Sequence, residues 1–599
     1  MINSILKTLA LVFIFSIVNT HFLLAQNKKI DPSVFGKMKG NKAEIFVVMQ
    51  EQADLSKASL LETKEQKGDF VFQILRGVSQ RSQSNIQIFL KAQKVDFQSF
   101  WIFNGVFLTA DEQLITQIAE RNDVAQIVSN PSSRLNLPEV DAADLKEDNT
   151  LKTRGALDIT WGIKAIKADA VWALGYTGQG VIVGGQDTGY DWEHPAIKKK
   201  YRGYNATTGQ VDHNYNWYDA IHRPDTTLPV AQQANPCGFN SKKPCDDNSH
   251  GTHTMGTMVG RDDTIAIGVA PDAQWIASRN MDKGNGTLYS YTECFQWFLA
   301  PTDSTNKLPN PRKAPHVMNN SWYCAPEEGC NASNFAILET ALNACRAAGI
   351  VVVVSAGNSG SNCSSVNQGP PAFFSKAFSI GATRSDDTIA GFSSRGPVTI
   401  DGSNRLKPNV SAPGVNVKSS IPGGRYANFN GTSMAGPHVA GAVALMISAN
   451  PKLAGQVDTI ERILERTTRQ MTTTQNCGSI LGTSIPNNTY GFGRIDVLEA
   501  VKQALNFKYA TGVSNNSIEK IVKVSPNPFG SEINVYTEGV EGLTQVEIVN
   551  VSSQVVVSKK EIFNFRNNIT IQLPNLSSGV YFYRIQNETQ RLVGKLVKM

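Results

Sequence analysis

Ile350-Val351-Val352-Val353-Val354 is the stretch of sequence that best indicates the fold. Five consecutive apolar, mostly β-branched residues leave no polar face, which is typical of a parallel strand buried on both sides. Outward from it, short apolar strands alternate with helical segments across residues 151–510, and the other strands are expected at 181–184, 275–277, 317–319 and 378–380. Strands that alternate with helices predict an α/β domain built on a doubly wound, mostly parallel sheet.

The segments on either side of this region have different patterns. Residues 43–130 carry strand-like and helix-like stretches in the order β-α-β-β-α-β, which predicts an N-terminal α+β domain of the ferredoxin-like type. A hairpin is expected there, with strands at 100–103 and 106–108 broken by Asn104-Gly105. Residues 517–599 contain β-rich stretches separated by Gly, Asn and Ser, which is typical of a small β-sandwich.

The first 25 residues are expected to be a removable signal peptide. Lys7 precedes an apolar run at 9–18, and a second apolar patch ends on the small residue Ala25. An uncleaved membrane anchor is the alternative interpretation. Polar residues interrupt the apolar stretch and no later run is long enough to span a bilayer, so the mature protein is expected to have no membrane span.

Composition indicates a folded, soluble protein. Hydrophobic residues make up 41% of the 599-residue chain and charged residues 18%, which excludes a disordered chain, and the length predicts several domains. The formal net charge is +6, and no long block of Lys and Arg occurs. Nucleic acid is therefore not an expected partner.

The eight cysteines all lie between residues 237 and 477. An even number of cysteines in an exported chain indicates disulfides, and the close pairs Cys237/Cys245 and Cys324/Cys330 would each close one loop. Eight cysteines allow about 105 pairings, so the partners of the others stay open. A zinc site is the alternative, but no Cys-x-x-Cys occurs and no histidine flanks these cysteines.

Three motifs of the α/β region contain residues suited to peptide-bond hydrolysis. Asp187 ends an apolar strand, His250 lies in the motif 248–253, and Ser433 stands at the start of an apolar helix, with Pro437 expected in its first turn. A serine hydroxyl needs a base to take its proton, and histidine titrates near neutral pH. A buried carboxylate fixes the tautomer of that histidine.

Each motif taken alone has a plainer interpretation. The aspartate is typical of many turns, the histidine of a satisfied core residue or a metal ligand, and the serine of a helix N-cap. Their order and their combination favour the catalytic interpretation.

The order Asp187, His250, Ser433 with these flanking residues resembles the subtilase family over residues 155–505. The resemblance implies a subtilisin-like fold and a secreted serine endopeptidase that acts through an acyl-enzyme on Ser433. It implies that Asp187 orients His250, that His250 is the general base and acid, and that His253 is structural. The segment 352–358 resembles the family's oxyanion-hole motif, which implies that Asn358 and the backbone N–H of Ser433 bind the oxyanion.

The segment 318–323 resembles the part of the family that pairs with the substrate backbone as an added strand. This resemblance implies substrate-binding roles for Ser321 and Trp322, although Trp322 is equally expected as a core residue. The chemistry requires no organic cofactor. Family members often carry structural calcium, and the Asp- and Asn-rich loop 212–219 has suitable oxygen atoms, but no metal ligands are assigned.

The domains on either side of the α/β region also resemble known domains. Residues 26–150 resemble a subtilase propeptide and its linker, which implies a zymogen inhibited by its own propeptide and cleaved in the polar linker 131–154. Residues 517–599 resemble the C-terminal sorting domain of the type IX secretion route, on the motifs at 525–528, 578–582 and 595–598. This implies a secreted or cell-surface protein whose partners include the secretion machinery. A generic β-sandwich that binds carbohydrate or protein is the alternative.

Two functions therefore fit the sequence. The first is an active endopeptidase whose substrates are proteins or peptides. The alternative is a catalytically silent surface binding or adhesion protein on the same scaffold. The presence of all four chemical residues, Asp187, His250, Asn358 and Ser433, favours the first.

Overall fold

The computed structural model describes residues 28–135, 137, 157–224, 235–508 and 521–598, the last range with short gaps at 539, 541, 553, 564–565, 574–575 and 588–590. The chain divides into two compact units, Met1–Phe507 and Lys508–Met599. The expected signal peptide at 1–25 lies outside the described residues, and so does most of the expected linker at 131–154.

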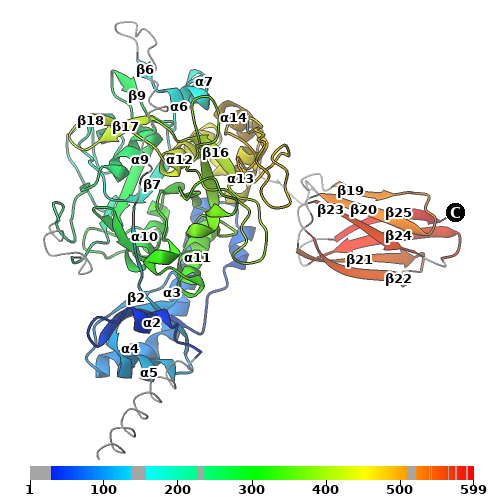
Figure 1. Cartoon of the computed structure of the whole chain (residues 1–599), viewed down its shortest axis with the longest axis horizontal. Helices are drawn as coiled ribbons and strands as arrows, with labels where there is room; N and C mark the ends of the chain where they lie inside the picture. Colours follow the sequence, from blue (N-terminus) through cyan, green and yellow to red (C-terminus); the bar gives the residue numbers. More distant parts are fainter. Residues whose placement is uncertain are drawn as a thin grey trace, which may run out of the picture. The chain divides into compact units, whose positions relative to one another are not determined.

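Seven parallel strands form the centre of the first unit (Figure 1). In their order across the sheet they are β16 (Val410–Pro413), β15 (Phe378–Thr383), β14 (Val351–Ser355), β13 (Val317–Asn320), β7 (Ile182–Asp187), β10 (Gln274–Arg279) and β8 (Trp217–Asp219). The predicted parallel α/β sheet is confirmed. The strand order reverses between β7 and β13, and sheets of this kind hold their sites at such a point, beyond the carboxyl ends of the strands.

Helices cover both faces of this sheet, and β14 explains why. Val351 and Val353 pack into one core with residues of α9 (His250–Val259) and α12 (Thr432–Ala449). Val352 and Val354 pack into a second core with residues of α10 (Leu288–Leu299) and α11 (Ala332–Ala347). Because alternate residues of a strand point to opposite faces, a strand between two cores has no polar face.

The helix α12 is apolar on all sides because it lies in the core. By length and composition alone, α12 could cross a membrane. The expectation that no apolar run after the signal peptide is long enough to do so is therefore wrong. However, 89% of α12 is buried inside the unit, as expected for the core helix of a soluble domain.

The N-terminal domain has a four-stranded antiparallel sheet in the order β2 (Phe97–Phe100), β3 (Gly105–Asp111), β1 (Lys42–Met49) and β4 (Val124–Ser129). Its helices are α3 (Lys64–Ser82), α4 (Ser84–Ala92) and α5 (Glu112–Ala119). The order along the chain is β-α-β-β-α-β, with the first helix divided in two.

The predicted hairpin strand at 100–103 is wrong. The strand ends at Phe100, and residues 101–104 form the turn. The reason is a contact with the α/β domain: the backbone N–H groups of Trp101 and Ile102 donate to the side chain of Gln296 on α10 rather than to a neighbouring strand. The buried side chains of this turn belong to the second core, together with α10 and α11.

The second unit is a β-sandwich. One antiparallel sheet contains β19 (Ile521–Ser525), β20 (Glu532–Glu538) and β23 (Arg566–Gln572). The other contains β22 (Val555–Phe563), β21 (Gly542–Asn550), β24 (Gly579–Gln586) and β25 (Arg591–Lys598). Its core combines residues of both sheets, including Ile533 and Val535 from the first and Val546, Ile548 and Ile585 from the second.

The predicted disulfides are confirmed, and the two close pairs are among them. Cys237 pairs with Cys245, Cys324 with Cys330, and Cys363 with Cys477 across 114 residues of sequence. Cys294 and Cys345 are buried and free. Within the described part of the chain, no group of three or more His, Cys, Asp or Glu side chains is arranged to hold a metal ion.

Candidate active site

The predicted site residues gather at the carboxyl ends of the central strands. Asp187 is the last residue of β7, Ser321 directly follows β13, and Asn358 lies three residues beyond β14. His250 is the first residue of α9, and Ser433 is the second residue of α12. The two helices pack against each other, and His250 contacts Asp187 while Ser433 contacts Ser321.

Asp187 and His250 form a buried pair. His250 Nδ1 lies 2.7 Å from Asp187 Oδ1, and the two side chains are 0% and 1% exposed. A carboxylate at Nδ1 keeps the proton on that nitrogen and leaves the lone pair on Nε2. His250 Nε2 has no hydrogen-bond partner among the described residues, so it is available to accept a proton.

Ser433 is hydrogen-bonded to Ser321 rather than to His250. Its hydroxyl donates to the backbone carbonyl of Ser321 at 3.2 Å, and the Ser321 hydroxyl donates to the backbone carbonyl of Ser433 at 2.9 Å. The structure thus brings Asp187 and His250 into contact, whereas the hydrogen bonds of Ser433 go to Ser321. Catalytic hydrogen bonds are often long or absent before substrate binds.

The prediction that Pro437 lies in the first turn of its helix is wrong. The helix α12 begins at Thr432, which places Pro437 in its second turn. A proline there has no N–H to donate to the carbonyl four residues earlier, which is that of Ser433. The Ser321 hydroxyl supplies the missing donor to the Ser433 carbonyl.

Asn358 lies where an oxyanion donor is needed. Its side-chain oxygen accepts hydrogen bonds from the backbone N–H and the hydroxyl of Thr432, both at 2.9 Å, and these contacts fix the orientation of the amide. A β-carbon placed on Gly431 would lie 3.5 Å from Asn358 Nδ2 and 3.5 Å from the backbone nitrogen of Ser433. Two N–H donors therefore flank one point, which suits a developing oxyanion.

The side chains of Ser321 and Trp322 face the interior. Ser321 is fully buried, and Trp322 is 1% exposed and stacks face to face on Tyr291, with ring centroids 3.8 Å apart. These side chains are closed off from solvent in the chain that still carries its N-terminal domain.

His253 is buried one helical turn after His250. Its Nε2 lies 2.9 Å from the carbonyl of Val417 and 3.1 Å from that of Ala427, and its ring stacks on Phe429. Burial and the nearby His250 lower the pKa of His253 to about 3. The residue is therefore neutral at working pH and packs as part of the core.

The chain that leaves the N-terminal domain runs along the edge of the site as an added strand. The short strand β5 (Ser132–Arg134) pairs antiparallel with β12 (Asn285–Thr287). The N–H of Leu135 donates to the carbonyl of Gly284 at 2.7 Å. A β-carbon on Gly284 would lie 3.4 Å from that of Leu135 and 3.1 Å from the side chain of Asn248, two residues before His250. The strand therefore ends close to the segment that precedes His250.

Residues 178–493, more than half of the chain, match the subtilase family. The chain belongs to the subtilase family. Its relatives include Bacillopeptidase F of Bacillus subtilis (strain 168), which is 35% identical over 464 residues, or 75% of this chain. Subtilisin E of the same organism is 30% identical over 60% of this chain and 74% of its own length. The subtilisin of Bacillus pumilus is 33% identical over 49% of this chain and 87% of its own length. The chain spans 30% of the length of Bacillopeptidase F.

Residues 523–599 of this subtilase match the secretion system C-terminal sorting domain. This match identifies the β-sandwich of the second unit as the sorting domain of the type IX route. The subtilase is therefore a secreted or cell-surface protein.

Asp246 is a residue of this subtilase site that sequence reasoning missed. Its carboxylate accepts the hydroxyl of Thr188, next to Asp187, at 2.9 Å. It also accepts the backbone N–H groups of Asn248, Ser249 and Thr252 at the start of α9. Asp246 thus ties the strand that carries Asp187 to the helix that carries His250. The signal in the sequence was the run Asp-Asp-Asn-Ser directly before His250, which is typical of a helix N-terminus.

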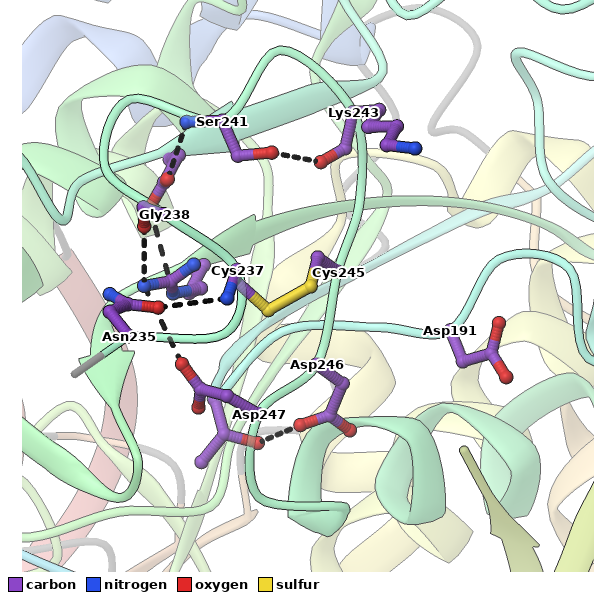
Figure 2. The surroundings of a disulfide bond; sticks show 12 residues. Asp191, Asn235, Cys237, Gly238, Ser241, Lys243, Cys245, Asp246 and Asp247 are labelled. Carbon is purple, nitrogen blue, oxygen red and sulfur yellow. Dashed lines mark hydrogen bonds and ion pairs between the residues drawn. A yellow bond between two sulfur atoms is a disulfide. The ribbon is translucent and has the colours of Figure 1, made fainter. Parts of the chain in front are cut away.

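A buried ion cluster lies beside Asp246 (Figure 2). The fully buried guanidinium of Arg279 lies 3.5 Å from Asp247 and 3.8 Å from Asp219, and it donates to the carbonyl of Gly238 at 3.2 Å. Gly238 belongs to the loop closed by the Cys237–Cys245 disulfide. Burial raises the pKa of Asp247 to about 7, although the charge of Arg279 opposes the rise.

Protein donors engage several oxygen atoms of the loop 212–219, where structural calcium was expected. The carboxylate of Asp219 accepts the backbone N–H groups of Ile221 and Ser241, at 3.0 and 2.7 Å, and faces Arg279. One oxygen of Asp212 accepts both the backbone and the side-chain N–H groups of Asn214. The other carboxylate oxygen of Asp212 is not among these contacts, and structural calcium stays a prediction.

Proposed function

We propose that this subtilase is a serine endopeptidase that hydrolyses peptide bonds through an acyl-enzyme on Ser433. The observation that carries the proposal is the buried Asp187–His250 pair, 2.7 Å apart, with Nε2 of the histidine left without a partner among the described residues. An imidazole held in this way can act as a base, because its Nε2 makes no hydrogen bond with the described residues. Two N–H donors next to Ser433 complete the set of groups that acyl transfer needs.

The groups would act in a definite order. Ser433 first turns from the Ser321 carbonyl toward His250 Nε2, which takes the hydroxyl proton as Oγ attacks the substrate carbonyl carbon. The negative charge on the substrate oxygen is stabilised by Asn358 Nδ2 and the backbone N–H of Ser433. The imidazolium, stabilised by Asp187, then gives its proton to the leaving amine. Water repeats the same steps on the acyl-enzyme and frees the product.

We also propose that the protein is made as a zymogen and that residues 28–135 inhibit it as a propeptide. Two features support this role. The N-terminal domain packs into the same core as α10 and α11, where Phe107 lies 4.5 Å from Tyr289 between ring centroids. In addition, β5 occupies the edge of β12 as a substrate strand would, with the backbone N–H of Arg134 donating to Glu328 at 2.6 Å. Strand addition of this kind binds peptides mainly through the backbone.

Substrates would therefore be protein segments that can extend along β12 once the propeptide has left. The sorting domain at 523–599 would bring the secretion machinery as a second class of partner.

Labelling with a serine-reactive fluorophosphonate tests the proposal. The matured wild type should label at Ser433, the Ser433→Ala variant should not, and both should be folded by circular dichroism. The control is Ser403→Ala, an exposed serine in a loop, which should label as the wild type does. A mature, folded wild type that neither labels nor hydrolyses an unfolded protein would overturn the proposal. A chain that instead bound a partner through the same surface would favour the adhesion function.

A further inference from the structure

Ser133 of the added strand makes a contact that the backbone pairing does not require. In the register of β5 with β12, Ser133 stands opposite Gly286. Its hydroxyl lies 2.5 Å from the hydroxyl of Tyr291 on α10. The side chain is buried, since Ser133 is 4% exposed. The strand position that Ser133 fills therefore points its side chain into the enzyme.

The space beneath this position is filled by aromatic side chains of the enzyme itself. A β-carbon on Gly286 would lie 2.3 Å from the Tyr291 hydroxyl, so the phenol lies directly under the backbone of β12. The rings of Tyr291 and Trp322 are parallel, and both residues are 1% exposed. Phe295 meets the edge of Trp322, with centroids 6.2 Å apart. A long side chain at the Ser133 position would have to displace this pair.

The Tyr291 hydroxyl is the polar group that this position offers. Burial raises the pKa of Tyr291, so the phenol stays protonated at working pH and both donates and accepts hydrogen bonds. A buried hydroxyl without a hydrogen-bond partner is unfavourable. The Tyr291 hydroxyl therefore favours a substrate that supplies a partner for it.

We propose that Tyr291 and Trp322 make the enzyme select serine or threonine at the substrate position that Ser133 occupies along β12. The stacked rings exclude large side chains, and the phenol hydroxyl favours a small side chain that carries a hydroxyl. This selectivity rests on the proposed peptidase function, and it names the substrates of that site more closely. Tyr291 and Trp322 are specificity-determining residues in this account, and they take no part in the chemical step.

Internally quenched peptides with the sequence of residues 129–142 test the selectivity. Serine, threonine, alanine or leucine is placed at the position of Ser133, and kcat/KM is measured with matured enzyme whose active sites are counted by fluorophosphonate labelling. We expect serine and threonine to exceed alanine by about 3- to 10-fold, the value of one hydrogen bond. We expect alanine to exceed leucine by about 5-fold or more, because leucine would overpack the position.

Two variants separate the hydroxyl from the shape of the site. In Tyr291→Phe the ratio of serine to alanine should fall to about 1, while leucine stays disfavoured. In Tyr291→Ala the space opens, so leucine should become a better substrate than serine.

The outcomes distinguish this inference from the function on which it rests. Full labelling together with a wild-type preference for leucine, or an unchanged ratio of serine to alanine in Tyr291→Phe, would overturn the inference and leave the peptidase function intact. Absence of labelling in the mature, folded wild type would overturn the peptidase function and the selectivity with it.

Discussion

The two halves of the candidate site are held together by different chemistry. In the base half, which consists of β7, β10 and α9, the Asp187 carboxylate contacts His250, Asp246 accepts the hydroxyl of Thr188, and Arg279 pairs with Asp247. In the nucleophile half, which consists of β13, β14 and α12, neutral contacts with Ser321 and Thr432 hold Ser433 and Asn358.

This difference suits the charge that each half would carry during the proposed reaction. The base half would have to stabilise a positive imidazolium, and the Asp187 carboxylate lies directly against the His250 ring. The nucleophile half has to stabilise a negative oxygen, so it presents N–H donors and the first turn of a helix, and no carboxylate takes part in its described contacts with Ser433 or Asn358.

The largest effect on activity should come from removing the charge of Asp187, the carboxylate that contacts His250. Asp187→Asn should lower kcat by about 10⁴-fold with the fold intact, because the amide favours the wrong tautomer of His250. Kinetics on an unfolded protein substrate, corrected for the fraction of mature enzyme, measures it. Asp191→Asn, in the loop that follows β7, is the matched control and should stay within about threefold of the wild type. A variant Asp187→Asn with more than a tenth of wild-type activity would contradict the assignment.

The nucleophile half should respond less to the loss of one neutral donor. Asn358→Ala should lower kcat by about 10²- to 10³-fold with little change in KM, because the amide acts mainly on the oxyanion of the transition state. Steady-state kinetics separates the two constants, and Asn362→Ala in the same exposed loop is the control. An increase confined to KM would mean that Asn358 binds substrate instead.

Substitution of Asp246 tests whether its carboxylate positions the Asp187–His250 pair. Asp246→Asn should lower kcat by about 10-fold and destabilise the protein by about 1–3 kcal/mol, because the carboxylate accepts hydrogen bonds from both sides of the pair. Unfolding is measured in a Ser433→Ala background, which prevents self-digestion. The matching variant in the nucleophile half is Ser321→Ala, which removes the hydroxyl that donates to the Ser433 carbonyl. An Asp246→Asn enzyme with wild-type kcat and reduced stability would give Asp246 a purely structural role.

The smallest effect concerns an ion pair at the outer edge of the base half. Burial lowers the pKa of His222, but the hydrogen bond and the charge of Glu293, 2.7 Å away, outweigh it and raise the pKa to about 9. Since this value exceeds that of the unfolded chain, about 6.5, the stabilisation is fully present below pH 6.5 and is lost as the pH rises through 9. His222→Gln should therefore cost about 1–2 kcal/mol at pH 6 and almost nothing at pH 10.

Urea unfolding of His222→Gln and its parent, both in the Ser433→Ala background, measures this difference at the two pH values. An equal loss of stability at pH 6 and pH 10 would show that the His222 ring contributes by packing alone.

The sequence predicted the parts of the fold whose patterns are local. The valine run of β14 has no polar face because both cores contact it, and this is visible without a structure. The strand β8 was missed because its three residues, Trp217–Asp219, lie in a polar segment and are defined only by their pairing with β10. The strands β19 and β25 are difficult to predict for a similar reason, since their lysines and arginines interrupt the apolar pattern.

The candidate site was predictable as far as its residue types are distinctive. Asp187, His250, Asn358 and Ser433 stand in recognisable motifs, and the structure places them at one edge of the sheet. The sequence could not indicate that Trp322 stacks on Tyr291, because 31 residues separate them and no periodicity links them. The contact between Arg279 and the disulfide loop is equally non-local, with 41 residues between its partners.

Pro437 has a consequence for how the site could be transplanted or redesigned. Because the helix α12 lacks the N–H that would bind the Ser433 carbonyl, the orientation of the nucleophile depends on a hydroxyl 112 residues away. The orientation of Ser433 is therefore set by two elements, α12 and the end of β13. A copy of α12 grafted into another protein without Ser321 would not reproduce this orientation. Any design that borrows this helix has to borrow the end of β13 as well.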